Sequence, residues 1–574
     1  MPVGRLCARV LLCATLLASV CSLLPAQAPA PQLAITLHPA VPDAQGFVRS
    51  LDVRITVSEN DAKPGEPLFG MPTVVDNVKT SAGAIEQLVA RDAKGQLLLS
   101  SRTEDAHYTW SALRVVHGPI TLTYRVSIGD QPNPFGAAPP FELRGEGRAI
   151  SGRADTFLLL PAVDQPYAVQ VHWDFAGFPA GAVGMSSRGV GDLRFDTPQP
   201  LSRLREVFLF GGLLSTYPEH PQPNGFFSAW QGEPPFDAGN LLQWTSHLYA
   251  HYKAFFRDNE THPYAVLLRS NLINAGGGVE LDGAFIGTFD GHTDPEELKL
   301  TLAHEMVHTF VHGLDGDNDG SGAWFSEGIA EYYQRELPLR AGSISPGDFL
   351  RNLNLTAARY YTNSLSHTPN EQIMPQFWVE TRVRVLPYDR GSLYFAALDS
   401  ELRRTTQGKK SLDDLILAML DLRRQHRPMN EQTWRALLQQ NLGNTGIQGY
   451  EAMLRGDLVL PDSTAFGPCF RRATRRLRRY ELGFDPKVLT EPTRIVRGIV
   501  PGSEAEKAGL RNGDHLLRPA PQDAIQADQN AEIHLEIERK GERFTVSYLP
   551  RGEAVEAYQW ERVPGADAAV CAAD

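Results

Sequence analysis

The sequence predicts a multidomain α+β protein. Short stretches that alternate apolar and polar residues dominate positions 29–165, which is typical of an antiparallel β domain. Helical periodicity dominates from about 334 to 468, and between these regions an apolar helix pattern carries the motif His-Glu-x-x-His. The chain of 574 residues has room for several domains. We expect a β domain, a mixed α/β domain with the site, a helical subdomain, a small C-terminal domain and a tail, at residues 29–165, 166–340, 341–475, 476–555 and 556–574.

Residues 1–28 have the features of a secretory signal. Arg5 and Arg9 precede the apolar run Val10–Leu24, and the small residue Ala28 ends a cleavage-site pattern. The run is too short for a comfortable membrane span, so no transmembrane segment is expected. Leu17 to Cys21 faintly resembles a lipid-attachment box, but Val20 fits it poorly. We expect export to the periplasm or the extracellular space, with a lipid anchor at Cys21 as the less favoured alternative.

The charge balance argues against a nucleic-acid partner. The formal net charge is −12, whereas binding to phosphates requires a basic face. A local basic run at residues 471–479 is the exception, and its spacing suits a solvated helix face or a linker.

Two cysteines remain after the predicted signal, Cys469 and Cys571. They can form at most one disulfide in an oxidising compartment, and the sequence does not show whether they meet.

The first two predicted domains contain recognisable strand and helix patterns. Strands are expected in the first domain at 47–57, 96–101 and 120–128, and in the second at 208–214 and 264–271. Residues 239–258 have the apolar spacing of an amphipathic helix.

The motif helix has a clear predicted start. Asp294, Pro295 and Glu297 form an N-cap, a first-turn proline and a capping-box acid. On this helix His304 and His308 are four residues apart, so they share one face and can bind one metal ion. The alternative is a chance motif, but a buried helix with these polar groups needs a reason for them, and a metal supplies one.

A third ligand follows on the next predicted helix. Eighteen residues, at positions 309–326, separate Glu327 from His308. Two imidazoles, a carboxylate and one open position are the ligand set of a hydrolytic zinc centre, with one Zn²⁺ per chain. Glu305 is then placed as the general base for a metal-activated water. Glu331, one turn after Glu327, suits a residue that orients a ligand histidine; the alternative is an ordinary surface glutamate.

A glycine-rich stretch precedes this helix. Gly276, Gly277 and Gly278 permit close approach of a ligand to the backbone, or a bulge, and Glu280 follows them. On these residues alone, a glycine-rich strand edge with an exposed acid is the simpler interpretation.

Together these motifs resemble the gluzincin aminopeptidases over roughly residues 30–560. One branch that fits is that of aminopeptidase N and leukotriene hydrolase, and the other is the glycyl aminopeptidase family, which ends in a PDZ domain. The resemblance implies a thermolysin-like zinc catalytic domain. It also implies that Glu280, with Gly277 and Gly278, binds the free amine of the substrate.

Two further segments resemble these families. Pro387 to Gly391 resembles a segment whose tyrosine, here Tyr388, hydrogen-bonds the oxyanion; without the resemblance Tyr388 could not be preferred to Tyr394. A helix is expected directly after it, at Ser392–Arg404, with others at 348–361, 412–424 and 431–441. Residues 501–514 and the loop Leu482-Gly483-Phe484 resemble a PDZ domain, which implies that this loop captures peptide C-termini. A strand is expected at Arg494–Val500.

The sequence departs from the glycyl aminopeptidase pattern in two places. That family usually has a longer insertion before the glutamate ligand, and a histidine where Leu281 follows Glu280. The expected partners are peptide or protein substrates. Three hypotheses for the function therefore stay open: an aminopeptidase, a PDZ-assisted zinc endopeptidase, and an inactive peptide-binding protein. The presence of both histidines, Glu327 and Glu305 argues against the third hypothesis, and of the other two we favour the first.

Overall fold

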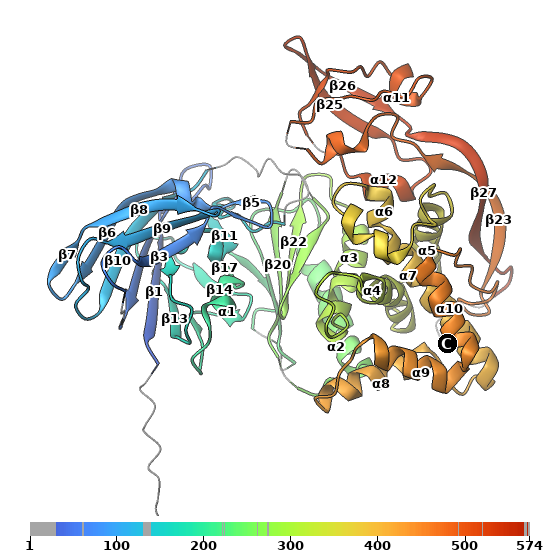
Figure 1. Cartoon of the computed structure of the whole chain (residues 1–574), viewed down its shortest axis with the longest axis horizontal. Helices are drawn as coiled ribbons and strands as arrows, with labels where there is room; N and C mark the ends of the chain where they lie inside the picture. The colour runs from blue at the N-terminus through green and yellow to red at the C-terminus, as the bar shows by residue number, and fades with distance from the viewer. Residues whose placement is uncertain are drawn as a thin grey trace, which may run out of the picture.

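The computed structural model describes residues 30–59, 62–129, 139–220, 222, 224–260, 262–271, 275–491, 493–518, 520–566 and 571. The predicted signal and its Cys21 lie outside these residues. Figure 1 shows a β-rich half in blue and green, a helical half in yellow and orange, and a small red domain beside the helices. This arrangement confirms the multidomain α+β class.

A seven-stranded sheet forms the base of the N-terminal region, with strands in the order β16-β13-β1-β2-β10-β6-β7. Buried side chains alternate with more exposed ones along β1, β2 and β10, so one face packs on the core. β1 pairs in parallel with β13, so this sheet continues past the boundary predicted at residue 165. The strands are Gln32–Pro39 (β1), Ser50–Val57 (β2), Ile85–Asp92 (β6), Gly95–Leu97 (β7), Ile120–Ser127 (β10), Ala168–Trp173 (β13) and Leu193–Arg194 (β16).

Two four-stranded sheets complete this region, in the orders β12-β3-β9-β8 and β11-β17-β14-β15. Apolar side chains from the first of them and from the seven-stranded sheet share one buried core. The elements are Pro67–Pro72 (β3), Val74–Val75 (β4), Val78–Lys79 (β5), Leu99–Glu104 (β8), His107–Ala112 (β9), Ala149–Arg153 (β11), Leu160–Pro161 (β12), Val183–Ser186 (β14), Gly189–Val190 (β15), Leu201–Arg205 (α1) and Phe208–Gly212 (β17).

A five-stranded sheet, β18-β19-β20-β22-β21, supports the site. Its three central strands run parallel, and β21 pairs antiparallel to β22 at the edge. The helices α2 and α3 pack on this sheet and on each other through the largest apolar core of the protein. The elements are Ser215–Tyr217 (β18), Phe226–Trp230 (β19), Ala238–Phe255 (α2), Tyr264–Ser270 (β20), Gly278–Leu281 (β21), Ala284–Phe289 (β22) and Pro295–Phe310 (α3).

The helical half consists of Ala323–Arg340 (α4), Pro346–Tyr361 (α5), Thr381–Arg384 (α6), Leu386–Thr406 (α7), Leu412–Arg424 (α8), Glu431–Leu442 (α9) and Asn444–Arg455 (α10). The predicted helix at 412–424 is confirmed, whereas α10 was not predicted. α7 begins at Leu386 rather than at the predicted Ser392, because Pro387 suits a first helical turn. Tyr388 therefore lies in a helix.

A two-stranded antiparallel ribbon joins the helical half to the small domain. It pairs β23 (Phe470–Tyr480) with β27 (Arg551–Arg562), and β27 packs on α5. The basic run is thus a strand, and the prediction of a helix face or linker was wrong. The reason is long-range: its backbone groups pair with residues more than seventy positions later, such as Arg478 with Ala554.

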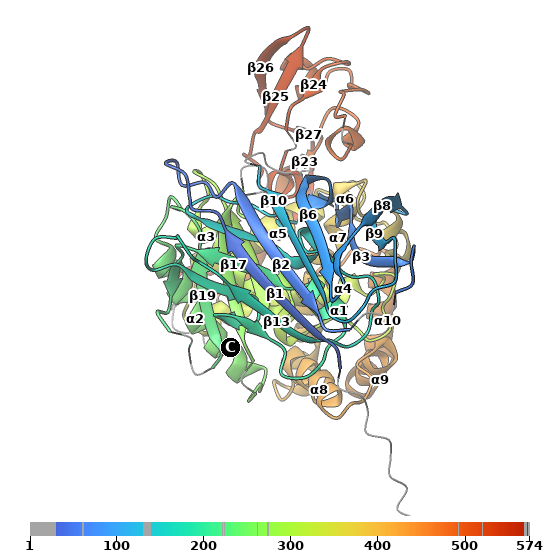
Figure 2. The same cartoon turned by 90° about the vertical axis from the view of Figure 1, so that its left-hand side faces the viewer.

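The small domain, residues 480–550, has an apolar core of its own. It projects from the main body in Figure 2. Its elements are Glu504–Lys507 (α11), His515–Leu516 (β24), Gln522–Ala527 (α12), Ile533–Arg539 (β25) and Glu542–Tyr548 (β26). The prediction of a strand at 494–500 was wrong. That segment forms an isolated bridge at Ile495 and backbone hydrogen bonds to neighbouring loops instead.

Cys469 and Cys571 form a disulfide, with their Cα atoms 5.4 Å apart. Within the described ranges, no helix combines the length and the apolar character that crossing a membrane would require.

Candidate metal centre

Helix α3 presents two histidines on one face. Asp294 caps the helix, since its carboxylate accepts a hydrogen bond from the backbone N–H of Glu296 at 2.9 Å, and Pro295 occupies the first turn. His304 and His308 lie one turn apart, and their Nε2 atoms are 3.3 Å from each other. The helix therefore directs two imidazole nitrogens to one point.

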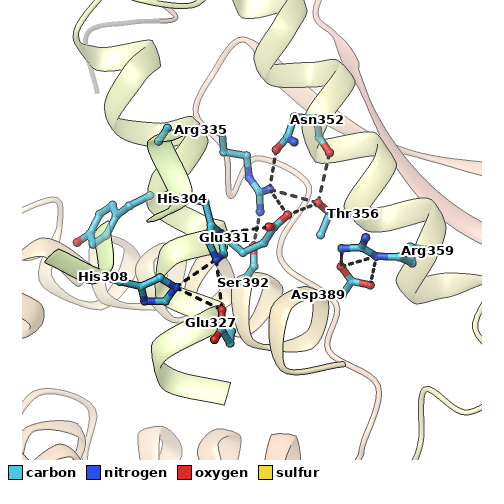
Figure 3. Close-up of polar contacts among 12 residues, drawn as sticks. His304, His308, Glu327, Glu331, Arg335, Asn352, Thr356, Arg359, Asp389 and Ser392 are labelled. Atoms are coloured by element: carbon cyan, nitrogen blue, oxygen red, sulfur yellow. Dashed lines mark hydrogen bonds and ion pairs between the residues drawn. The ribbon is translucent and has the colours of Figure 1, made fainter. Parts of the chain in front are cut away.

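Helix α4 brings a carboxylate to the same point. Glu327 Oε2 is 3.2 Å from His304 Nε2 and 3.4 Å from His308 Nε2 (Figure 3). These three donor atoms all lie within 4.8 Å of one another. Two imidazoles and one carboxylate are one of the donor sets found in hydrolytic zinc sites, so the predicted ligand residues fit a zinc ion.

Close helix packing holds α4 against α7. A Cβ on Gly328 would lie 2.7 Å from Gly391 Cα, and a Cβ on Gly391 would lie 2.4 Å from the carbonyl oxygen of Trp324. Both positions therefore exclude a side chain. Because Gly328 follows Glu327, this contact fixes Glu327 relative to the helix that carries Tyr388.

Glu331 is a buried residue and not the surface glutamate of the alternative interpretation. One carboxylate oxygen lies 3.8 Å from His304 Nδ1, on the side of the imidazole opposite the metal donors. The other accepts a hydrogen bond from Thr356 Oγ1 at 2.8 Å and lies 3.4 Å from Arg335 Nη1. The predicted role of Glu331 in orienting His304 is compatible with this placement.

The network behind Glu331 was not predicted. Arg335, whose side chain is fully buried, also binds Ser392 on α7 and Asn352 on α5. Beside it, Arg359 and Asp389 form a second buried pair (Figure 3). The spacing of four residues between Glu331 and Arg335 on one helix was a usable signal, but the partners on α5 and α7 come from tertiary packing.

Burial and mutual charge shift the pKa values of the ligands. Burial favours the uncharged form of His308, but the hydrogen bond and the charge of Glu327 outweigh it and raise the pKa of His308 to about 9. Burial also favours neutral Glu327, but hydrogen bonds from His304 and His308 bring its pKa well below the usual range. In the metal-free protein a proton on His308 thus compensates the carboxylate.

Glu305 and Tyr388 lie beside the donor set. Glu305 is half-buried, and burial raises its pKa although both histidines act in the opposite direction. The ring of Tyr388 stacks on that of His304, with centroids 5.8 Å apart and an interplanar angle of 22°. Burial, together with the charges of Glu327 and Glu305, raises the pKa of Tyr388 well above 10, so its hydroxyl stays protonated.

Glu280 lies on the edge strand β21. Burial raises its pKa to about 7, against the opposing effect of His308. Gly278 is required there because a Cβ would meet the Phe285 ring at 2.2 Å. The carbonyl of Gly277 accepts hydrogen bonds from the backbone and the hydroxyl of Thr288, so Gly277 holds the strand to β22.

The loop residues Leu482, Gly483 and Phe484 belong to the small domain. The side chains of Leu482 and Phe484 lie in its core. Gly483 has φ +82°, and a Cβ there would lie 2.7 Å from Ala505 Cβ. Its carbonyl accepts a hydrogen bond from Val500 N at 2.8 Å. The loop is thus a fixed backbone turn.

Comparison with known proteins gives one family match. The model of the M61 glycyl aminopeptidase family matches residues 298–381, which include both histidines, Glu305, Glu327 and Glu331. A search of curated protein sequences found no match.

Several solved structures are similar. An aminopeptidase N family protein from Idiomarina loihiensis has a TM-score of 0.64 at 15% identity, over 92% of this chain and 98% of that one. An M1 zinc metallopeptidase from Deinococcus radiodurans has a TM-score of 0.40 at 18% identity, over 75% and 96%. Yeast LTA4 hydrolase has a TM-score of 0.41 at 12% identity, over 74% and 67%. The first of these shows that the fold of an aminopeptidase N family protein extends over most of this chain. The family match supports a metallopeptidase of the aminopeptidase-like kind.

Proposed function

We propose that this protein is an exported zinc aminopeptidase that removes N-terminal residues from peptides. The observation that carries the proposal is the convergence of His304 Nε2, His308 Nε2 and Glu327 Oε2, with Glu305 between the two histidines in sequence. The family match over residues 298–381, which contain these four residues, is in keeping with it.

His304, His308 and Glu327 would hold one Zn²⁺, and Glu331 would orient His304 through Nδ1. When bound, zinc supplies a Lewis acid that brings the pKa of a water molecule to about 7. With only these three protein ligands, a bound zinc ion would keep a position open for such a water.

Glu305 would accept a proton from the attacking water and deliver it to the leaving amine. Its raised pKa favours this exchange, because a base whose pKa lies nearer the working pH can both take and return a proton. Tyr388 would donate a hydrogen bond from its protonated hydroxyl to the carbonyl oxygen as negative charge develops there.

Glu280, with Gly277 and Gly278, would bind the free amine of the peptide. With a pKa of about 7, Glu280 is partly protonated at neutral pH in the substrate-free protein. A substrate ammonium group would favour the carboxylate form, because opposite charges lower the pKa of an acid. Glu280 would thus select substrates with a free N-terminus.

The small domain would act as a PDZ domain whose loop Leu482-Gly483-Phe484 offers backbone amides to a peptide C-terminus. The fixed turn at Gly483 supports this role. The disulfide between Cys469 and Cys571 supports export to the periplasm or extracellular space, because disulfides persist in oxidising compartments.

The test is hydrolysis of aminoacyl reporter amides, free and N-acetylated, by the zinc-loaded protein and by Glu305→Gln. We expect activity on free-amine substrates and a loss of about 10²- to 10⁴-fold in Glu305→Gln with zinc content retained. Glu297→Gln, on an exposed turn of the same helix, is the matched control and should keep wild-type activity.

The alternative function is a zinc endopeptidase to which the small domain recruits substrate tails. A domain with its own core next to the peptidase fold favours it. Cleavage of acetylated peptides, with the same dependence on Glu305, would decide for it. Zinc bound without any hydrolysis would instead indicate an inactive peptide-binding protein.

A further inference from the structure

The small domain is attached to the helices around Tyr388 by more than the ribbon. Asp523 on α12 lies against α6, where Arg384 Nη2 is 2.9 and 3.0 Å from its two carboxylate oxygens and Nε is 3.2 Å from Oδ2. The hydroxyl of Thr381 also donates to Asp523, and Gln526 donates to that hydroxyl at 3.0 Å. One carboxylate thus holds both ends of α6.

A second contact runs from the backbone of the same residue. The carbonyl oxygen of Asp523 accepts a hydrogen bond from Arg359 Nη1 at 3.3 Å. Arg359 in turn holds Asp389 by three hydrogen bonds of 2.7 to 3.1 Å, and the side chain of Asp389 is fully buried. Asp389 is the residue directly after Tyr388.

The two contacts bracket the first turn of α7. α6 ends at Arg384 and α7 begins at Leu386, so Val385 alone separates them. Val385 is the N-cap of α7, and a valine side chain cannot accept a hydrogen bond from the first turn. The position of this turn, and with it of Tyr388, therefore depends on groups outside the helix.

We infer that Asp523 is a positioning residue, supplied by the small domain, that holds Tyr388 against His304 for its part in the reaction. This inference rests on the proposed role of Tyr388. The small domain is then part of the catalytic unit as well as a candidate peptide-binding module.

The first test compares Asp523→Ala with wild type in the full-length, zinc-loaded chain. We expect kcat to fall about tenfold with KM changed less than about twofold, because displacement of a group that acts in the transition state lowers the rate more than substrate binding. Asp523→Asn, which keeps an acceptor oxygen, should lose less. The matched control is Glu491→Ala, an acid of the same domain with a similar exposed fraction, which pairs with Arg497.

A double-mutant cycle decides whether the effect passes through Tyr388. In a Tyr388→Phe background, Asp523→Ala should cause no further loss of kcat. An equal tenfold loss in both backgrounds would overturn the inference.

Amide hydrogen exchange gives a readout that does not need activity. In Asp523→Ala we expect at least about tenfold faster exchange over residues 381–392, with unchanged exchange in α3 and no such effect in Glu491→Ala. Unchanged exchange over 381–392 would overturn the inference. An inactive wild type would refute the proposed function instead, while the exchange data would still decide whether Asp523 holds this segment.

Discussion

Two groups of charged residues in this protein differ in their exposure to solvent. Around the candidate metal centre, Arg335 has a fully buried side chain and binds Glu331, Ser392 and Asn352. On the ribbon, Arg475 is half-exposed, with 51% of its side chain accessible, and it pairs with Glu561. Both groups contain ion pairs between arginine and glutamate.

The difference lies in what water can do for each pair. At Arg475 water solvates both charges, so the pair contributes little to folding and leaves the side chains free to move. At Arg335 water is excluded, so each charged atom needs a protein partner, and losing one partner leaves the other charge uncompensated. Burial thereby holds Arg335 and Glu331 in one arrangement, and Glu331 needs a fixed position to orient His304.

Removing each arginine in turn should have very different effects on stability. We expect Arg335→Leu to lower the free energy of unfolding by about 3–5 kcal/mol, because Glu331 would be left buried without its cation. Arg475→Leu should change it by less than about 1 kcal/mol. Urea unfolding of both variants measures this, and equal costs would show that the Glu331–Arg335 network has no special role.

The pH dependence of zinc binding tests the charge on His308 at the candidate metal centre. His308 has a pKa of about 9 in the metal-free protein, so below that pH a proton must leave before the imidazole can bind zinc. The apparent zinc affinity should rise about tenfold per pH unit between pH 7 and 8 and level off above pH 9. Competition with a chelator at several pH values measures it, and a flat profile would contradict the raised pKa.

A smaller effect is expected from the contact between α4 and α7. Gly328→Ala should cost about 1–3 kcal/mol of stability, because its Cβ would force the two helices apart next to Glu327. Gly449→Ala is the matched control: it is an exposed position within α10 where a Cβ meets nothing within 4 Å, so it should stabilise slightly. Thermal unfolding compares them, and a Gly328→Ala variant as stable as wild type would show that this contact can relax.

Local signals predicted the helix start and the shared face of the two histidines. Asp294 and Pro295 gave the start of α3, and the spacing of His304 and His308 predicted a shared face, as the structure has them. Glu327 lies on a separate helix, yet its donor atom reaches both histidines. The start of α3 and the shared face of the two histidines depend on capping and helix period, and both are determined by residues close together in sequence.

Features that depend on distant pairing were missed. The strand β23 was predicted as a helix face or linker because its partner β27 lies far along the chain. The contacts of Asp523 with α6 were likewise absent from any local pattern. Tyr388 needed a family resemblance to be noticed, since its stacking on His304 is a tertiary contact between residues far apart in sequence.

The disulfide between Cys469 and Cys571 makes the last part of the chain a closed loop. The two cysteines are 102 residues apart in sequence, and the ribbon and the small domain lie between them. A single protease cut inside the loop would leave both new ends tied to the helical half. A mechanical load applied at Cys571 would pass directly to Cys469, so the small domain would not be pulled open by it.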